Sequence, residues 1–466
     1  MEGKIDMAAR RQVTNKLRSL DKLAAASGET EGRIGHYVKV GLLHRQADGD
    51  FEADSVHRLR LIQFAHSRGV SNQQLEAATA RQGDLLALYG ELTPGAEAPA
   101  DLARAAHDLG LDDVVVEELA EILGWDDLGS GTHADMTTLR TVAEAVELGM
   151  PRDALMQLMR VLADATDRLA DAVLRTFHDY VHERFRAQGV VGRQLLEATQ
   201  HVAGPALKLV EPALVSFHRR AYQRASREDL LRHLAEDTTA PSKTLGEERA
   251  TVLFVDLASF TALTATMGDH AAADVLRRFG AAVRSSATRH GGRILKQIGD
   301  AFMLLFSEPA DAIEFGLAVD RFADAESQFP ALHIGAHHGT VLYREGDYVG
   351  GTVNLAARVA SSGRAGQFLI TEDLRDLAAD RVDADFTLSP PRRLKGIHDP
   401  IRLVEVRRRS LERANRETDP VCGLLLDPDD VASWITWRER TFAFCCDMCR
   451  HAFVEDPGRF VTVHEN

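Results

Sequence analysis

The chain has fewer basic than acidic residues and contains no long apolar run. Its 55 lysines and arginines stand against 70 aspartates and glutamates, which gives a formal net charge of -15. A charge of this sign argues against general affinity for nucleic acid or anionic membrane surfaces. No apolar run approaches the roughly 20 residues needed to cross a bilayer, and the start, Met1 to Asp6, lacks the apolar segment of a signal peptide. We therefore expect a cytoplasmic protein without a membrane anchor.

Cysteine is also scarce, and its placement is uneven. All four cysteines lie after Arg416, at positions 422, 445, 446 and 449. Disulfides are rare in cytosolic proteins, so a cluster of cysteines in a short segment favours metal binding. The composition as a whole, with 45% hydrophobic and 27% charged residues, is typical of a globular protein. At 466 residues the chain is too long for one core, which predicts three or four domains.

Two aspartates, Asp256 and Asp300, each end an apolar run at a polar turn. A carboxylate at such a place can be presented to a cation by the edge of a sheet. Magnesium and manganese take hard oxygen ligands and are commonly held by one or two carboxylates together with substrate phosphates. The pair therefore suits a nucleoside triphosphate site, and the alternative is two turn aspartates that follow unrelated strands.

A second polar pair follows downstream, where Asn354 and Arg358 are one helical turn apart and share one face. An amide and a guanidinium presented together can hold a ribose oxygen and the charge that develops on a phosphorane. With these blocks in this order, residues 250–408 closely resemble the class III nucleotidyl cyclase catalytic domain. The resemblance covers roughly a third of the chain.

The resemblance implies a two-metal site at the first block. Asp256 and Asp300 match the two metal-binding carboxylates of the family, and Leu257 falls within the same metal site. Two Mg²⁺ or Mn²⁺ ions per active site would there activate the ribose 3'-hydroxyl and neutralise the triphosphate.

The resemblance also implies which base is bound. Lys296 and Asp347 match the positions that read the base. A lysine donor and an aspartate acceptor fit the adenine edge, whereas guanine would set a carbonyl against the aspartate. Sites built on hydrogen bonds reject such mismatches strongly, so ATP is the predicted substrate.

Further residues complete the predicted substrate site. Asn354 matches the residue that orients the ribose and Arg358 the one that stabilises the transition state. Lys395 falls where a lysine commonly contacts the terminal phosphates. By the same resemblance, Phe260 and Thr261 belong to the substrate site.

The turn after the first aspartate departs from the family pattern, because Ser259 stands where glycine is usual. Glycine lets the backbone approach a phosphate closely. Serine there is expected to lower activity without abolishing it.

The residue pattern of this segment predicts a ferredoxin-like α+β fold with the order strand, helix, hairpin, helix, strand. In the resembled family each site is shared across a head-to-tail dimer, so we expect a homodimer with two equivalent sites. The expected elements are a strand at 251–255, a helix at 271–290, hairpin strands at 293–298 and 301–306, a helix at 310–325 and a strand at 333–337.

The first half of the chain, residues 12–235, is predicted to be almost wholly helical. A short pattern around Leu59 recurs 80 positions later around Leu139, which suggests a duplicated unit. The two copies, about 18–80 and 98–160, resemble degenerate winged helices of the mercury-resistance regulator (MerR) type. The first recognition helix offers Arg33 and Lys39, and the second is acidic. This composition argues against DNA binding and favours an interaction or sensing role.

Tandem winged helices followed by long helices resemble the helical regulatory domain of some actinobacterial adenylate cyclases. Such a domain would control the dimer geometry through a linker at 236–249, which contains Pro241. The activating signal is unknown, and a small molecule, a lipid or pH are all open. His178 and His182, one helical turn apart, could bind a metal but lack an identifiable third ligand.

The end of the chain, residues 418–462, resembles a YHS domain, a small treble-clef-like module associated with metals. Matched by position, Cys422, Cys445 and Cys449 are the candidate ligands. Cys446 could be the fourth ligand or a redox-active thiol. Zn²⁺ is the default because thiolate sites suit it, although another soft metal such as copper also fits. The alternative is buried structural thiols in a metal-free fold.

Two functions are consistent with these observations. The first is a cytosolic adenylate cyclase that forms 3',5'-cyclic AMP and pyrophosphate. The second is a cyclase-like module that senses ATP without turnover, coupled to an amino-terminal half that binds DNA or protein. The complete set of six catalytic positions favours the enzyme, because a degenerate sensor is expected to have lost at least one.

Overall fold

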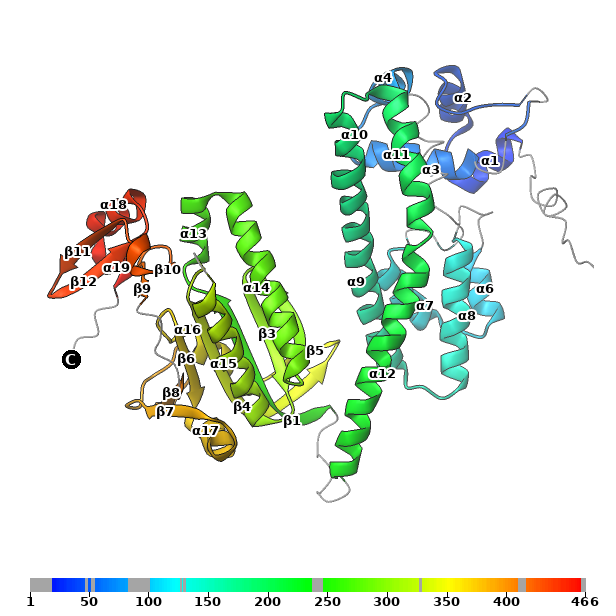
Figure 1. Cartoon of the computed structure of the whole chain (residues 1–466). Coiled ribbons are helices and arrows are strands. Elements are labelled where there is room, and N and C mark those ends of the chain that lie inside the picture. Colours follow the sequence, from blue (N-terminus) through cyan, green and yellow to red (C-terminus); the bar gives the residue numbers. More distant parts are fainter. Residues whose placement is uncertain are drawn as a thin grey trace, which may run out of the picture. The chain divides into compact units, whose positions relative to one another are not determined.

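The computed structural model describes residues 19–46, 49–51, 55–82, 101–125, 128, 131–236, 246–326, 329–409 and 416–461. The chain divides into two compact units, residues 1–239 and 240–466, each of which is described by itself (Figure 1). Residues 237–245 of the predicted linker, including Pro241, lie outside the described residues, as does position 462 at the predicted end of the tail.

The first unit is built from helices, as its sequence predicts. None of the described helices is long and apolar enough to cross a membrane. The helices are α1 (Leu20–Ser27), α2 (Glu31–Lys39), α3 (Ser55–Ser67), α4 (Asn72–Gln82), α6 (Leu102–Asp108), α7 (Asp113–Leu123), α8 (His133–Glu147), α9 (Arg152–Phe177), the π-helical turn η2 (His178–His182), α10 (Glu183–Ala187), α11 (Gly192–Leu207) and α12 (Val210–Glu236).

The segments α1–α3 and α6–α8 each pack around a core of their own. Leu59 and Ile62 of α3 and, 80 positions later, Leu139 and Val142 of α8 are all fully buried. The matched spacing of core residues explains why the sequence pattern repeats. In the parts of this unit that the structure describes, no β-strand accompanies either copy, so the hairpin of a winged helix is not seen there.

The second unit contains an eight-stranded sheet in the order β2-β3-β1-β4-β6-β8-β7, with β5 paired to β4. Only β4 and β6 pair in parallel among these strands. The strands are β1 (Glu247–Leu257), β2 (Arg293–Ile298), β3 (Ala301–Phe306), β4 (Leu332–Arg344), β5 (Asp347–Val349), β6 (Gln367–Thr371), β7 (Ala384–Leu388) and β8 (Leu403–Arg408).

The predicted strand, helix, hairpin, helix and strand all form, but β1 and β4 are longer than expected. The two strands pair from one end of β1 to the other, with Glu247 opposite Leu342 and Leu257 opposite Leu332. This long ladder carries β4 beyond the core into the hairpin with β5. The sequence pattern predicted too short a strand for β4, because the strand continues into a segment that contains polar residues and a glycine.

Helices cover both faces of the sheet (Figure 1). Leu253 and Val255 of β1 pack into a core with α14 (Asp269–Arg289) and α15 (Pro309–Ala325), whereas Val252 belongs to the opposite core with Ala356 of α16 (Gly351–Ser361). This alternation is what a strand buried on both faces requires. A side chain at Gly335 of β4 would lie 2.1 Å from the backbone nitrogen of Ala360, so glycine lets α16 lie directly on β4.

The carboxy-terminal tail, residues 416–461, packs against the catalytic domain. Its buried Phe444 and Phe453 join the same hydrophobic core as Phe329 and Leu257 of that domain. The tail is therefore continuous with the catalytic domain and is not an isolated module. Its elements are β9 (Glu417–Thr418), β10 (Leu425–Leu426), the hairpin β11 (Ser433–Trp437) and β12 (Arg440–Phe444), α18 (Asp447–Glu455) and α19 (Pro457–Phe460).

Candidate active site and tail cluster

The two predicted metal ligands lie together at one end of the neighbouring strands β1 and β3. Asp256 is the second-last residue of β1, and Asp300 lies in the two-residue turn between β2 and β3, next to β1. Burial and the neighbouring Asp300 carboxylate raise the pKa of Asp256 to about 7. The buried Oδ1 of Asp256 has no hydrogen-bond partner among the described residues. Two adjacent carboxylates with an unpaired oxygen fit a divalent cation, which would relieve their repulsion.

Residues 256–259, which we call the metal loop, lead directly into α13 (Phe260–Met267). The Leu257 side chain is 2% exposed, so only its backbone could reach a metal ion. Ser259 has φ +55° and ψ +32°, in the left-handed region. Glycine adopts this conformation without strain and serine does not, which explains physically why the loop favours glycine at this position.

Phe260 and Thr261 form the first turn of α13. The first turn of a helix has backbone N–H groups without intrahelical partners, and these groups favour phosphate. The backbone N–H groups of this turn are what the two residues could offer to a phosphate, and their predicted contact with substrate stays a prediction.

The two predicted base-reading residues form an ion pair. Lys296 Nζ of β2 contacts Asp347 Oδ2, and Asp347 Oδ1 accepts the N–H of Tyr348 at 2.8 Å. Tyr348 is 4% exposed and packs with Met303 and Leu305 of β3. The β4–β5 hairpin therefore carries Asp347 to Lys296 from a distant part of the sequence. Both side chains are more than a third exposed, so a ligand can reach the pair.

The remaining predicted residues lie on exposed surfaces. Asn354 and Arg358 are both exposed on α16, and neither side chain has a polar partner within the described part of the chain. Lys395 is exposed beside Leu394, whose buried side chain packs with Val359 of α16. The structure thus gathers Asn354, Arg358 and Lys395 around one helix. Within one chain, no hydrogen bond or ion pair between described residues joins them to the aspartate pair.

Three tail cysteines converge with an aspartate. The Cys422 and Cys449 sulfurs each lie 3.6 Å from the Cys445 sulfur. Tetrahedral thiolate ligands about 2.3 Å from one Zn²⁺ ion are separated by about 3.8 Å, so these spacings fit a single soft metal ion. The ligand atoms of Asp419, Cys422, Cys445 and Cys449 all lie within 4.8 Å of one another, and we call these residues the tail cluster.

Asp419 was missed by the sequence prediction, although it stands in the same turn as Cys422. It is fully buried, and its carboxylate accepts the N–H groups of Val421, Cys422 and Cys445. Cys446 Sγ lies 3.6 Å from Cys445 Sγ, but Cys446 is not one of the four converging residues. The fourth donor that the geometry offers is therefore Asp419.

The cysteines also differ in acidity. Hydrogen bonds from Cys422 and Cys445 lower the pKa of Cys449, whereas hydrogen bonding with Cys422 and Cys449 raises the pKa of Cys445. One sulfur of the cluster thus carries negative charge most readily. Thiolate is the form that binds metal, so a cluster with one readily ionised sulfur is consistent with a metal site.

In the part of the chain that the structure describes, no third ligand converges on the predicted histidine pair, although Glu183 Oε1 lies 3.7 Å from His178 Nε2. The His178 and His182 rings stack 5.1 Å apart in the π-helical turn, and His182 Nδ1 lies 3.4 Å from the Thr199 hydroxyl. Among the described residues, the tail cluster is the group of three or more His, Cys, Asp or Glu ligands that converges.

Comparison with known proteins places the catalytic domain in context. Residues 243–402 match the Adenylate and Guanylate cyclase catalytic domain family. The chain is 26% identical over 366 residues to a pH-sensitive adenylate cyclase of Mycobacterium tuberculosis. The aligned region is 75% of this chain and 88% of that protein. Among solved structures, the chain is similar to the adenylyl cyclase CyaB from Pseudomonas aeruginosa, with 26% sequence identity and a TM-score of 0.31. The aligned residues are 36% of this chain and 100% of the CyaB chain.

An uncharacterized protein of Mycobacterium bovis is 30% identical over 366 residues, which are 76% of this chain and 91% of that protein. The similarity therefore extends beyond the catalytic domain into the helical unit. From the matched domain and these relatives, the chain belongs to the class III adenylate and guanylate cyclase family.

Proposed function

We propose that the chain is an adenylate cyclase that converts ATP to 3',5'-cyclic AMP and pyrophosphate. The observation that carries this assignment is the pairing of Lys296 with Asp347 at an accessible place on the sheet. A bound adenine would exchange this ion pair for one donor and one acceptor that match its edge. Guanine would meet the aspartate with a carbonyl, leaving two acceptors opposed. The named relatives that are adenylate cyclases support the same assignment.

The chemistry requires the ribose 3'-oxygen to attack the α-phosphorus while the bond to the pyrophosphate oxygen breaks. Asp256 and Asp300 would hold Mg²⁺ or Mn²⁺, which when bound supplies Lewis-acid polarisation of the phosphates. Asn354 orients the ribose. Arg358 and Lys395 place positive charge beside the reacting and terminal phosphates, and fixed charge of this kind lowers the barrier because it needs no reorganisation during the reaction.

We propose that the active site is completed by a second copy of the chain. Asn354 and Arg358 are exposed and unpartnered in the described part of the chain, although both are required by the chemistry. A head-to-tail dimer would set this face of α16 against the aspartate pair of the partner. Two equivalent sites would result, since a closed two-fold dimer uses both surfaces twice.

The competing function is an ATP sensor without turnover. It is distinguished by incubating the purified full chain with Mn²⁺ and either ATP or GTP and measuring the cyclic nucleotide. We expect cyclic AMP from the wild type and none from Asp300→Ala. ATP binding without product in the wild type would favour the sensor.

The base assignment has its own test. The double variant Lys296→Glu with Asp347→Cys should lose ATP use and gain preference for GTP, because glutamate accepts from the guanine ring N–H and amine. Full retention of ATP selectivity would show that other residues read the base. A matched surface pair, Arg381→Glu with Glu308→Cys, should leave selectivity unchanged, since that exposed ion pair lies elsewhere.

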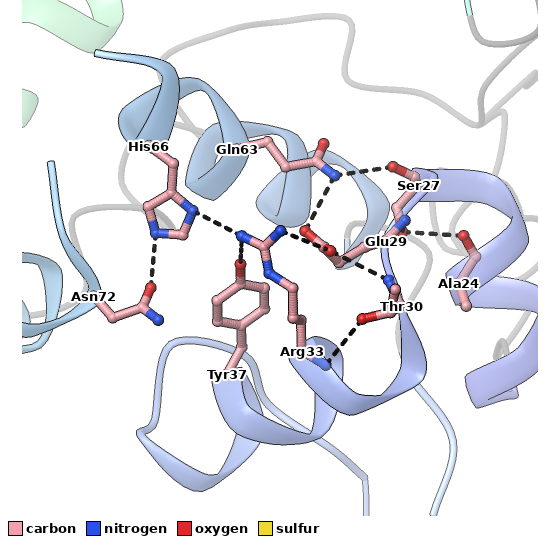
Figure 2. A network of polar contacts seen from close by, with 9 residues as sticks. All are labelled: Ala24, Ser27, Glu29, Thr30, Arg33, Tyr37, Gln63, His66 and Asn72. Carbon is pink, nitrogen blue, oxygen red and sulfur yellow. Dashed lines mark hydrogen bonds and ion pairs between the residues drawn. The ribbon is translucent and has the colours of Figure 1, made fainter. Parts of the chain in front are cut away.

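We propose that the helical unit regulates the dimer and that pH is one signal it can read. Figure 2 shows a polar network in which Arg33 contacts Glu29, Tyr37 and His66. A guanidinium only donates, so His66 Nδ1 must accept from it, and Nε2 then donates to Asn72 Oδ1 at 2.7 Å. Protonation of His66 would set two donors against each other and break the link between α2 and α4.

The same network bears on the prediction about DNA. Arg33 is one of the two basic residues of the expected recognition helix, and it is paired with the Glu29 carboxylate, which is 5% exposed. Its charge is thus partly neutralised within the fold, which supports the expectation that this helix does not bind DNA.

The pH signal is tested by measuring cyclase activity from pH 5.5 to 8. His66→Gln keeps a neutral hydrogen-bonding side chain, so we expect it to flatten the pH profile. His107→Gln, at an exposed histidine of α6, is the control. An unchanged profile in His66→Gln would leave a small molecule or a lipid as the signal.

We propose that the tail is a YHS-type module whose cluster holds one soft metal ion, with Zn²⁺ as the first choice. The sulfur spacings and the buried Asp419 support this site. Metal content of the full chain, purified without chelator, is measured by mass spectrometry. We expect one equivalent in the wild type and much less in Cys445→Ser.

A further inference from the structure

The tail lies directly on the segment that precedes β4. Leu425 N donates to Phe329 O at 3.0 Å, and Ala331 N donates to Gly423 O at 2.9 Å. A bridge between Pro330 and Leu424 completes this short antiparallel contact. These backbone hydrogen bonds fix the tail in one register on the catalytic domain.

The contact continues to the metal loop. Ala258 N donates to Ala331 O at 2.8 Å, so Ala331 is bonded to the metal loop on one side and to the tail on the other. Gly423 has φ +75°, and a side chain there would lie 2.4 Å from Ala258 O. The tail backbone therefore abuts the loop that carries Asp256, and only glycine permits this approach.

A second contact joins the tail cluster to α13. Cys449 Sγ lies 3.7 Å from the Thr266 hydroxyl. Thr266 also donates to Ala262 O at 2.9 Å, within α13. The helix whose first turn faces the substrate thus touches, near its other end, a predicted metal ligand of the tail.

A third contact fixes the amino-terminal end of the tail to the catalytic domain. Arg416, whose side chain is 11% exposed, donates to both carboxylate oxygens of Asp427 at 2.7 and 2.8 Å. It also donates to the carbonyls of Asp324 and Glu326 at the end of α15, at 2.7 and 3.0 Å. This fork fixes the tail at a second point on the catalytic domain, with charge-assisted hydrogen bonds of defined geometry.

We infer that the Cys422–Gly423 turn is a positioning element of the active site, which holds the metal loop through Ala258 and Ala331. Because Gly423 follows Cys422 directly, metal bound at the tail cluster would fix this turn, and loss of that metal would release the loop. The tail cluster would thereby control how well Asp256 and Asp300 bind Mn²⁺. This inference rests on the proposed cyclase activity only for its kinetic readout.

The test uses Gly423→Ala in the full chain, with Gly291→Ala as the matched control. Gly291 also has positive φ (+62°), but its added side chain would meet only the Asp311 carboxylate, at an ordinary 3.7 Å. Mn²⁺ binding is measured by electron paramagnetic resonance, cyclic AMP formation by kcat and the Mn²⁺ concentration for half activation, and tail metal by mass spectrometry.

In Gly423→Ala we expect Mn²⁺ to bind at least about tenfold more weakly and turnover to fall by up to roughly 100-fold, the order of loss that a displacement of about 1 Å can cause. Gly291→Ala should bind Mn²⁺ like the wild type. Equal Mn²⁺ affinity in both variants would overturn the inference. If the wild type binds Mn²⁺ but makes no cyclic nucleotide, the proposed activity fails while the binding comparison still decides the inference.

A second variant covers the case in which Gly423→Ala does not fold. Thr266→Val removes the hydroxyl that faces Cys449 and keeps the shape of the side chain. In Thr266→Val the Cys422–Gly423 turn keeps its contacts with Ala258 and Ala331, so we expect removal of the tail metal to weaken Mn²⁺ binding about as much as in the wild type. Mn²⁺ binding in Thr266→Val that no longer responds to the tail metal would overturn the inference, because it would show that α13, and not the turn, transmits the state of the tail.

Discussion

The unit that contains the catalytic domain holds two candidate metal centres of opposite character. The Asp256 and Asp300 pair offers hard oxygen ligands beside an open substrate site, and the repulsion within it is unrelieved. The tail cluster offers three sulfurs and a buried carboxylate already satisfied by backbone N–H groups. Open sites with few protein ligands suit catalytic ions, whereas closed sites with four suit structural ions. On this reasoning, we expect the first centre to exchange its ion and the second to keep it.

The largest expected effect separates the two centres by mutation. Asp300→Ala should lower cyclic AMP formation by at least roughly 1000-fold, because it removes one of the two carboxylates that would hold the metal ions on the reacting phosphates. The tail metal measured by mass spectrometry should stay at the wild-type level. Cys445→Ser should lose the tail metal and keep reduced but measurable turnover, because the released tail turn would hold the metal loop less firmly. Loss of the tail metal in Asp300→Ala would mean that the tail cluster depends on the aspartate pair.

The next prediction concerns sharing between subunits, which applies to the catalytic centre alone. Mixed chains of Asp256→Ala and Asn354→Ala should regain about a quarter of the wild-type activity, since half of randomly formed dimers are mixed and each has one intact site. Activity is measured after the two inactive proteins are unfolded and refolded together. No recovery, with mixed dimers demonstrated by differential tagging, would count against composite sites.

A smaller effect comes from pH. The pKa of Asp256 is raised to about 7 in the metal-free fold, so the native state binds a proton more tightly than the unfolded state. Protonation therefore adds stability as pH falls from about 7 toward the ordinary aspartate value of 3.8, and ionisation removes it as pH rises. Asp256→Asn should accordingly raise the melting temperature of the chain at pH 8, without added divalent cation, and have little effect at pH 5.

The same proton competes with the metal ion. Mn²⁺ affinity at the aspartate pair should fall by about tenfold per pH unit below pH 7, because binding must release the proton from Asp256. The tail metal should be retained over the range from pH 6 to 7. These affinities are measured by titration at each pH, and a flat profile for Mn²⁺ would indicate that Asp256 is ionised without metal.

The smallest expected effect tests the loop that joins the two centres. Ser259→Gly should raise the free energy of unfolding by up to about 1 kcal/mol, because glycine relieves the left-handed strain and partly offsets that gain by its freedom in the unfolded chain. It should also raise turnover modestly. Ser285→Gly, at an exposed position inside α14 near its carboxy-terminal end, should instead lower the free energy of unfolding by about 0.5–1 kcal/mol. Urea denaturation and steady-state rates measure both variants.

The sequence predicted more about the structure and function of the catalytic unit than about those of the helical unit. The hairpin strands at 293–298 and 301–306 have the predicted bounds, because a turn at Gly299 separates two short apolar runs. In the helical unit the core positions around Leu59 and Leu139 recur as the repeat predicts, but helix packing alone names no ligand. The proposed regulatory role of that unit is therefore supported mainly by its place in the sequence before the catalytic domain and by the His66 network.

The sequence by itself predicted the family, which the comparisons confirmed, and it proposed the catalytic residues, because both rest on residue type and spacing along short segments. Tertiary structure alone decided three further points: the pairing of Lys296 with Asp347, the left-handed conformation at Ser259, and the contact of Gly423 with Ala258. Each depends on segments far apart in the chain or on a backbone angle. Hydrophobic patterns specify which residues are buried, but they do not specify which buried surfaces meet.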